Sequence, residues 1–293
     1  MTSQSTLRQY ARATQHLVST RALEVLVLQA SPILGCFLGG FSLKPSGVIR
    51  LGCLLTGSLA LTAHVFVFND WAGHSSDIRD PRRSPRVFDR RGISRRQVAC
   101  VATALLIIAN VSFAAVGRRS VFLGAAIAAL SVLYSSSPRW GKSTPIFASI
   151  NHLVGGALHF LLGYTLFRPL DAKGVMISLF FGLVFAAGHL NQEVRDYEGD
   201  LINGIRTSAA VFGCRRAFLA SLFLFTAAYA ILAGLAAFGI LPRLLLWTIV
   251  LWPLQLAWSL RALQRGLGFE TALWMQRRYR VLFALIGLAM LAR

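Results

Sequence analysis

The chain has 293 residues, of which 55% are hydrophobic and only 14% are charged. Soluble domains carry about 25% charged residues, so this composition excludes an ordinary soluble domain. The 30 Lys and Arg against 11 Asp and Glu give a formal net charge of +19, but the basic residues lie between long apolar runs, which argues against a nucleic-acid-binding protein.

Long uncharged runs follow one another along the chain. A helix that crosses a hydrocarbon core of about 30 Å needs about 20 apolar residues. We therefore predict an all-α polytopic bundle of about nine transmembrane helices. The predicted spans are residues 25–43, 51–68, 97–117, 120–138, 143–167, 174–192, 217–242, 244–260 and 281–292, the last needing residues 270–280 to complete it. We expect residues 1–20 to form a cytoplasmic N-terminal segment and residues 21–293 to form a single transmembrane domain.

The basic residues between the spans predict the orientation in the membrane. With nine spans and a cytoplasmic N-terminus, the inside segments hold 22 of the 30 Lys and Arg, and the outside segments hold 8. Cytoplasmic loops are enriched in Lys and Arg, so the asymmetry supports this orientation. Because the chain is compact and shows no organelle-targeting extension, we expect a bacterial plasma membrane.

A first group of acidic residues follows the second apolar run. Asp70, Asp77, Asp80 and Asp89 lie there within a stretch that is also rich in arginine. Acidic residues contribute little to topology, so topology does not explain them. Asp70 and Asp77 share one face of a helix if that helix continues past Gly73.

A second group follows the sixth run, on the same predicted side of the membrane. Glu193, Asp196 and Asp200 have the spacing i, i+3, i+7 of one helix face, and Glu198 lies beside them. Like the first group, this stretch contains an Arg-Asp pair and closes with a glycine and an Arg-Arg pair that opens the next run. The two stretches therefore form a weak internal repeat of helix, acidic loop and helix.

Two opposed carboxylate faces repel each other unless a cation lies between them. Carboxylates at a membrane edge are costly and usually functional. Hard oxygen ligands without cysteine suit Mg²⁺, which binds through a few carboxylates together with substrate phosphates. Neighbouring basic side chains can clamp phosphate oxygens. The residues that fit this description are Arg82, Arg83, Arg86, Arg139, Lys142 and Arg206. The pattern thus predicts a Mg²⁺–diphosphate site, with ordinary solvated loops as the alternative.

The second acidic stretch resembles the UbiA superfamily of intramembrane prenyltransferases. The resemblance rests on Glu193-x-x-Asp196-x-x-x-Asp200, followed by GIRTSAAVFG at 204–213. The segment YSSSPRWGKSTPIFASIN at 134–151 also resembles the family's fourth loop and fifth helix.

The first acidic stretch departs from the family pattern, Asn-Asp-x-x-Asp-x-x-x-Asp. Asn69, Asp70 and Asp77 match it, whereas Gly73 replaces the central aspartate. Asp80 and His74 are the candidates to compensate.

The resemblance implies that Mg²⁺ and an isoprenyl diphosphate bind between the two motifs. The implied ligands of the Mg²⁺–diphosphate are Asn69, Asp70, Asp77, Asp80, Glu193, Asp196 and Asp200. The diphosphate oxygens would contact Arg82, Arg86, Arg139, Lys142 and Arg206. The substrate pocket would include His64, Tyr134, Asn151, His189 and Tyr197.

The leading hypothesis is transfer of a prenyl group from an isoprenyl diphosphate to a lipophilic acceptor, of which an aromatic one is favoured, inside the bilayer. A terpene cyclase of the UbiA type, which ionises the same diphosphate without an acceptor, is the first alternative. A non-catalytic, transporter-like membrane protein is the second. No nucleic acid is expected as a partner.

Overall fold

The computed structural model describes residues 3–136 and 141–292, and these contain helices and no β-strand. The predicted all-α class is confirmed. In chain order the elements are α1 (Ser3–Ser19), α2 (Ala22–Leu28), α3 (Ala30–Leu38), α4 (Pro45–Arg79), η1 (Ser84–Arg86), η2 (Phe88–Arg91), α5 (Arg95–Val116), α6 (Arg118–Ser136), α7 (Phe147–Phe167), α8 (Ala172–Ile202), α9 (Ser208–Phe212), α10 (Cys214–Ala237), η3 (Arg243–Val250), α11 (Leu251–Arg265) and α12 (Phe269–Leu291).

Seven helical segments in the described ranges are long and apolar enough to cross a membrane. They are α4, α5, α6, α7, α8, α10 and the continuous segment η3–α11. An eighth span would join Ala13–Ser19 to Ala22–Leu38, two pieces that meet at a bend of 59°. The predicted first span, 25–43, lies in the second piece.

The ninth predicted span, 281–292, is the second half of α12. Residues 270–280 complete it as one helix, as expected, but Arg277, Arg278 and Arg280 lie in its first half, so α12 is less apolar than the seven segments above. It nevertheless packs against α8 and α3 within the bundle. The prediction of about nine spans is therefore approximate.

The second acidic stretch lies in α8, and Asp70 and Asp77 of the first lie in α4, where the sequence pattern predicted acidic loops; Asp80 and Asp89 follow α4. α4 continues eleven residues past the apolar run that ends at residue 68, and α8 continues ten past residue 192. α4 ends where it does because Asp80 precedes Pro81, and a residue before proline avoids the helical conformation; Asp80 is extended (φ −80°, ψ 115°). α8 ends at Ile202, and two residues later Gly204, with a φ of 63°, lets the Ile205 N–H donate back to the Asp200 carbonyl.

Close helix contacts hold the centre of the bundle together. α7 packs on α8 and α3, and α8 packs on α10. A β-carbon at Gly163 of α7 would lie within 2 Å of the Pro32 carbonyl oxygen of α3, so only glycine allows this approach.

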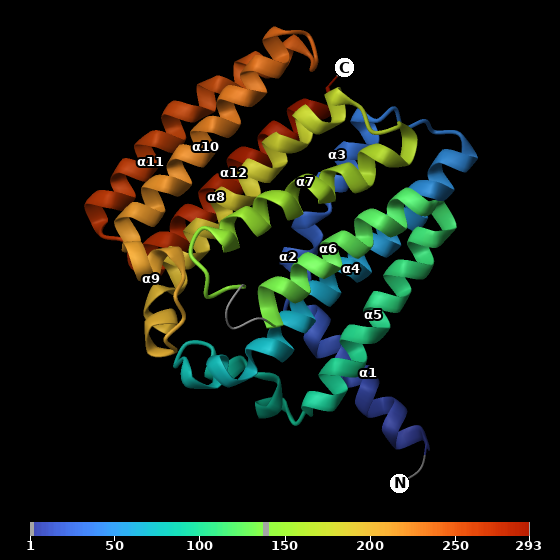
Figure 1. Cartoon of the computed structure of the whole chain (residues 1–293), viewed down its shortest axis with the longest axis vertical. Coiled ribbons are helices and arrows are strands. Elements are labelled where there is room, and N and C mark those ends of the chain that lie inside the picture. Colours follow the sequence, from blue (N-terminus) through green and yellow to red (C-terminus); the bar gives the residue numbers. More distant parts are fainter. Residues whose placement is uncertain (1–2, 137–140, 293) are drawn as a thin grey trace.

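Both acidic helix ends lie at one end of the bundle. Figure 1 shows the loop that follows α4 and the short helix α9 that follows α8 side by side below the main helices. An ion pair from Arg82 in the loop after α4 to Glu198 near the end of α8 joins the two motifs (2.7 Å). The expectation that the two motifs share one side of the protein is therefore met.

Candidate active site between the acidic helix ends

A cavity of about 2070 Å³ begins between the ends of α4 and α8 and continues into the bundle. Near the ends of α4 and α8, the carboxylates of both acidic motifs line it, among them Asp77 and Asp196. Its inner end is lined by apolar side chains, including Phe181, Phe283 and Met290. The cavity thus combines a charged mouth with an apolar interior.

One guanidinium group joins the two acidic motifs. Nη1 of Arg83 donates to Oδ1 of Asp77 at 3.0 Å, and Nη2 donates to Oδ2 of Asp196 at 2.6 Å. Its Nε lies 3.5 Å from Oδ2 of Asp80. Three carboxylates from the two helix ends therefore surround a single cation.

The charge on Arg83 is strongly favoured by its surroundings. Burial alone lowers the pKa of this guanidinium, but the carboxylates of Asp196 and Asp77 more than offset burial and raise the pKa above its ordinary value. Arg83 therefore stays cationic and compensates the repulsion between the facing carboxylates.

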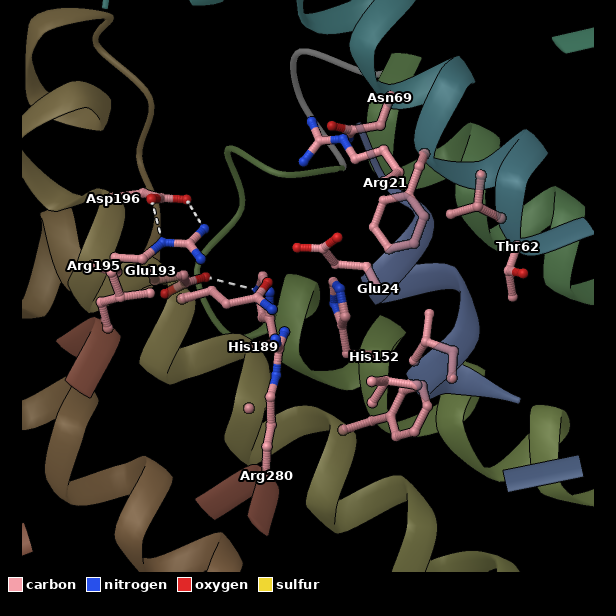
Figure 2. A pocket seen from close by; sticks show the side chains of 18 of the residues that line it. Arg21, Glu24, Thr62, Asn69, His152, His189, Glu193, Arg195, Asp196 and Arg280 are labelled. Atoms are coloured by element: carbon pink, nitrogen blue, oxygen red, sulfur yellow. Dashed lines mark hydrogen bonds and ion pairs between the residues drawn. The ribbon is translucent and has the colours of Figure 1, made fainter. Parts of the chain in front are cut away.

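Other protein cations pair with the remaining carboxylates around the cavity. Arg21, between α1 and α2, donates from Nε to Oδ2 of Asp70 at 3.3 Å. Nζ of Lys142 lies 3.6 Å from Oδ1 of Asp200. A second guanidinium on Asp196 comes from Arg195, which donates through two nitrogens, as Figure 2 shows. An incoming anionic ligand can therefore draw on basic groups that are already in place.

The side chain of Asp80 packs directly against α8 at Gly199. A β-carbon added at Gly199 would lie 2.3 Å from Oδ2 of Asp80, so the carboxylate occupies the space that a side chain at this position would fill. The same carboxylate accepts the Arg82 backbone N–H at 2.9 Å. His74, the other candidate to compensate for Gly73, instead contacts Asp89 at 3.1 Å and does not line the cavity.

Two stacked histidine rings line the cavity beside Glu193. The rings of His152 (α7) and His189 (α8) are parallel with centroids 3.8 Å apart, and the ring of Tyr134 meets both edge-on. Nε2 of His189 lies 3.0 Å from Oε1 of Glu193, whose other oxygen accepts the Ala209 N–H of α9. Figure 2 shows His152, His189 and Glu193 among the side chains that line the cavity, together with Glu24 of α2.

Comparison with known proteins identifies the family. Residues 33–288 match the model of the UbiA prenyltransferase family. The chain belongs to this family. No curated protein matches it significantly.

Solved structures of UbiA homologues share this fold. The homologue from Archaeoglobus fulgidus bound to GPP and Mg²⁺ is 17% identical with a TM-score of 0.67, over 94% of this chain and 97% of that one. The apo homologue from Aeropyrum pernix K1 is 17% identical with a TM-score of 0.68, over 89% and 95% of the two chains. A structure reported for digeranylgeranylglyceryl phosphate synthase is 16% identical with a TM-score of 0.68, over 96% and 97%.

In this UbiA-family chain, most of the residues predicted for the site line one cavity. The structure brings together Asn69, Asp70, Asp77, Asp80, Arg82, Arg86, Tyr134, Lys142, Asn151, His189, Glu193, Asp196 and Asp200. The carboxylate of Glu193 contacts the Ala209 N–H of α9 and the ring of His189, and it is not one of the carboxylates that contact Arg83.

Four predicted site residues are not brought to the cavity or lie outside the described ranges. His64 is buried and its Nδ1 contacts the Ala102 carbonyl oxygen at 2.8 Å, so its ring serves α4–α5 packing. Tyr197 packs on the cluster around Val194 and Met275, and Arg206 is exposed beyond the end of α8. Arg139 lies outside the described residues.

Several cavity residues carry roles that sequence reasoning did not assign. The sequence predicts that Arg83 binds phosphate, but nothing in its sequence context shows that its side chain contacts the carboxylates of both acidic motifs. Arg21 and Glu24 come from the N-terminal part, which no motif connects to the site. His152 carried a signal, because the residues at 134–151 resemble the family and it follows directly, but only the fold shows its ring against His189.

The donor set of the UbiA-family site fits magnesium that arrives with a diphosphate. No group of three His, Cys, Asp or Glu among residues 3–136 and 141–292 is arranged to hold a metal by itself. Mg²⁺ does not need such a group, because it keeps waters and binds through one or two carboxylates plus substrate phosphates. Asp77 and Asp80 on one side and Asp196 and Asp200 on the other offer such carboxylates.

Proposed function

We propose that this UbiA-family chain is a Mg²⁺-dependent enzyme that transfers a prenyl group from an isoprenyl diphosphate to a lipophilic, aromatic acceptor within the membrane. The observation that carries the proposal is the convergence of Asp77 and Asp196 on Arg83 at the mouth of a cavity with an apolar interior. The homologue solved with GPP and Mg²⁺ supports the choice of donor.

The charged mouth would bind the diphosphate. Asp77, Asp80, Asp196 and Asp200 would hold Mg²⁺, which when bound neutralises the leaving diphosphate as a Lewis acid. Arg82, Arg83 and Lys142 would exchange their carboxylate partners for phosphate oxygens, since guanidinium groups bind both kinds of oxyanion.

The apolar interior would hold the prenyl tail and protect the developing allylic cation. Water is a competing nucleophile, and an apolar wall of residues such as Phe181 and Phe283 excludes it. The ring of Tyr134 lies at the boundary between mouth and interior, where an aromatic face stabilises positive charge.

Polar groups below the diphosphate site favour transfer over cyclisation. The side-chain oxygen of Asn151 is buried and makes no hydrogen bond, and Asn151 lines the cavity. His152 donates from Nδ1 to the Ala148 carbonyl, so Nε2 of the neutral ring is an acceptor of hydrogen bonds. These groups suit an acceptor with a hydroxyl, whereas a cyclase benefits from an inert wall around its cation.

Product analysis with labelled donors tests the proposal. Purified protein is incubated with Mg²⁺ and radiolabelled geranyl, farnesyl or geranylgeranyl diphosphate, with and without aromatic acceptors. We expect diphosphate release that depends on both Mg²⁺ and an acceptor. Release of a hydrocarbon or terpene alcohol without an acceptor would instead indicate cyclisation. Absence of release with every donor, from a folded protein, would indicate a non-catalytic role.

Substitution of the carboxylates tests the site. Asp77→Ala and Asp196→Ala should each lower turnover at least about 10²-fold, the cost of removing one electrostatic stabiliser of a transition state. Asp89→Ala is the matched control, because Asp89 belongs to the first acidic stretch but contacts His74 and does not line the cavity. Full activity in either cavity variant would remove that residue from the site.

A further inference from the structure

A second cavity of about 350 Å³ lies at the end of the bundle opposite the acidic motifs. Four arginines line it, and we call them the far-end arginine cluster: Arg50, Arg118, Arg119 and Arg168. Arg50 lies on α4 twenty-seven residues before Asp77, which is about 40 Å at the rise of an α-helix. The cluster is therefore separate from the proposed active site.

The positive charge of this cluster is largely uncompensated. Arg168 pairs with Asp171 at 2.7 Å, and this is the one ion pair between described side chains that involves the cluster. Arg50 lies over the ring of Phe167, 5.5 Å from its centroid. Like charges that share one small cavity repel, so an anion from outside the chain would stabilise the arrangement.

The cluster also gathers arginines on the side of the membrane where the predicted topology places few basic residues. Only 8 of the 30 Lys and Arg belong to the segments predicted outside, and half of those 8 line this cavity. Topology explains basic residues at the other end of the bundle, but it does not explain why four gather around one cavity at this end.

Two further features of the cavity suit an oxyanion. α6 begins at Arg118, so the positive end of its helix dipole adjoins the cavity. Thr165 of α7 also lines the cavity, is 8% exposed, and its hydroxyl oxygen is buried without a hydrogen-bond partner. A buried hydroxyl without a partner is costly, and a phosphate oxygen would satisfy it.

We propose that the far-end arginine cluster binds a phosphate group, and that this phosphate belongs to the headgroup of an anionic phospholipid. Guanidinium groups bind phosphate through paired hydrogen bonds. The cavity lies where α4 and α6 begin and α5 and α7 end, which is the level at which headgroups meet membrane-spanning helices. Nearby apolar side chains face outward, including Ile49 (66% exposed), Val111 (66%) and Phe122 (73%), and can contact the acyl chains.

Lipid binding can be measured without any catalytic assay. Delipidated protein in neutral detergent is titrated with phosphatidylglycerol, phosphatidylcholine or inorganic phosphate, and bound lipid is counted by native mass spectrometry. The test variant carries Arg118→Gln and Arg119→Gln. The matched control is Arg243→Gln, which removes an arginine from the same end of the bundle but not from the cavity.

We expect the unmodified protein and Arg243→Gln to retain phosphatidylglycerol in preference to phosphatidylcholine. The double variant should bind it at least about tenfold more weakly, as loss of charge-assisted hydrogen bonds predicts. Equal retention of phosphatidylglycerol by the double variant would overturn the site. Displacement of the lipid by millimolar inorganic phosphate would assign the cluster to free phosphate and overturn the lipid part of the proposal.

Discussion

In the proposed function, Arg83 lies between the carboxylates that would hold Mg²⁺. It contacts Asp77 and Asp196 at once, so removal of its charge leaves two carboxylates facing each other. In Arg83→Gln we expect Mg²⁺ alone to raise the melting temperature more than it does in the unmodified protein. Turnover should fall by about 10²-fold, because a charge that would stabilise the leaving diphosphate is lost. Thermal unfolding with and without Mg²⁺, together with a turnover assay, checks both effects.

Arg90→Gln is the matched control for Arg83→Gln. Arg90 is an exposed arginine of η2 in the same loop and does not line the cavity. The interpretation of Arg83 fails if its variant and the control respond to Mg²⁺ alike.

Of the two candidates to compensate for Gly73, Asp80 lines the cavity and His74 does not, so we expect Asp80 to take this role. Asp80→Asn keeps an oxygen that can accept the Arg82 N–H but loses the charge beside Arg83. We expect Mg²⁺ affinity in the presence of donor to fall about 10–100-fold, the range seen when groups around a metal site are altered.

The double variant Gly73→Asp, Asp80→Asn should then recover affinity. A β-carbon at position 73 would lie 3.4 Å from Oδ2 of Asp77, an ordinary contact, so a carboxylate there fits on the same face of α4. A double variant no better than Asp80→Asn would show that Asp80 acts through the loop alone. Calorimetric Mg²⁺ titration with a non-hydrolysable donor analogue makes the comparison.

At the scale of single residues, the sequence predicts those site residues that belong to a local motif. Asp77, Asp196 and Asp200 lie where their spacing and the family motif place them. The motifs do not tell whether neighbouring residues such as His64 and Tyr197 face the cavity. Positions within one helical turn of each other can face either the cavity or a neighbouring helix, and these two face neighbouring helices. Gly199 could not be found either, since its role depends on Asp80, which is distant in the sequence.

At the scale of helices, apolar runs locate the spans but not their ends. The predicted spans of residues 51–68 and 174–192 stop where the acidic motifs begin, whereas α4 and α8 continue for about three turns. The backbone hydrogen bonds of a helix continue whether the side chains are polar or apolar. The carboxylates on these last turns, such as Asp77 and Asp196, line the cavity. The helix ends are instead decided by Pro81 after α4 and Gly204 after α8, which are local signals that hydropathy ignores.

The wall that α7 contributes to the cavity predicts which donors are used. Gly155 lines the cavity, and a β-carbon there would have no heavy atom within 4 Å. Its neighbour Gly156 faces Phe185, which is eleven residues, or about 16 Å, from Asp196 along α8. In Gly155→Phe the ring would block the inner half of the cavity, so we expect the preference to move from geranylgeranyl towards geranyl diphosphate by about tenfold or more in kcat/KM.

Gly234→Phe controls for the added ring. Gly234 also has open space around it but lies on α10 and does not line the cavity. Competition between the two donors in one reaction measures the preference directly. An unchanged ratio in Gly155→Phe, with turnover intact, would mean that the prenyl tail leaves the cavity before it reaches α7.

At the scale of the whole molecule, charged side chains gather at two opposite ends of the bundle. The acidic motifs, Arg83 and the cavity mouth lie at one end, and the far-end arginine cluster lies at the other. The predicted orientation places the first end in the cytoplasm. This orientation decides from which side a water-soluble diphosphate reaches the site, so it is the property of the whole molecule that matters most for the proposed function.

Single cysteines at the two ends test the orientation, in a background that lacks the native Cys36, Cys53, Cys100 and Cys214. One cysteine is introduced by Ser75→Cys, at an exposed position near the end of α4, and the other by Leu170→Cys, which is 57% exposed between α7 and α8. In intact cells, a membrane-impermeant maleimide should label Leu170→Cys and should reach Ser75→Cys only after the membrane is opened. The opposite labelling would place the acidic motifs outside. Since the geometry around Arg83 does not depend on orientation, that result would leave the site in place and require the diphosphate to come from the other side of the membrane.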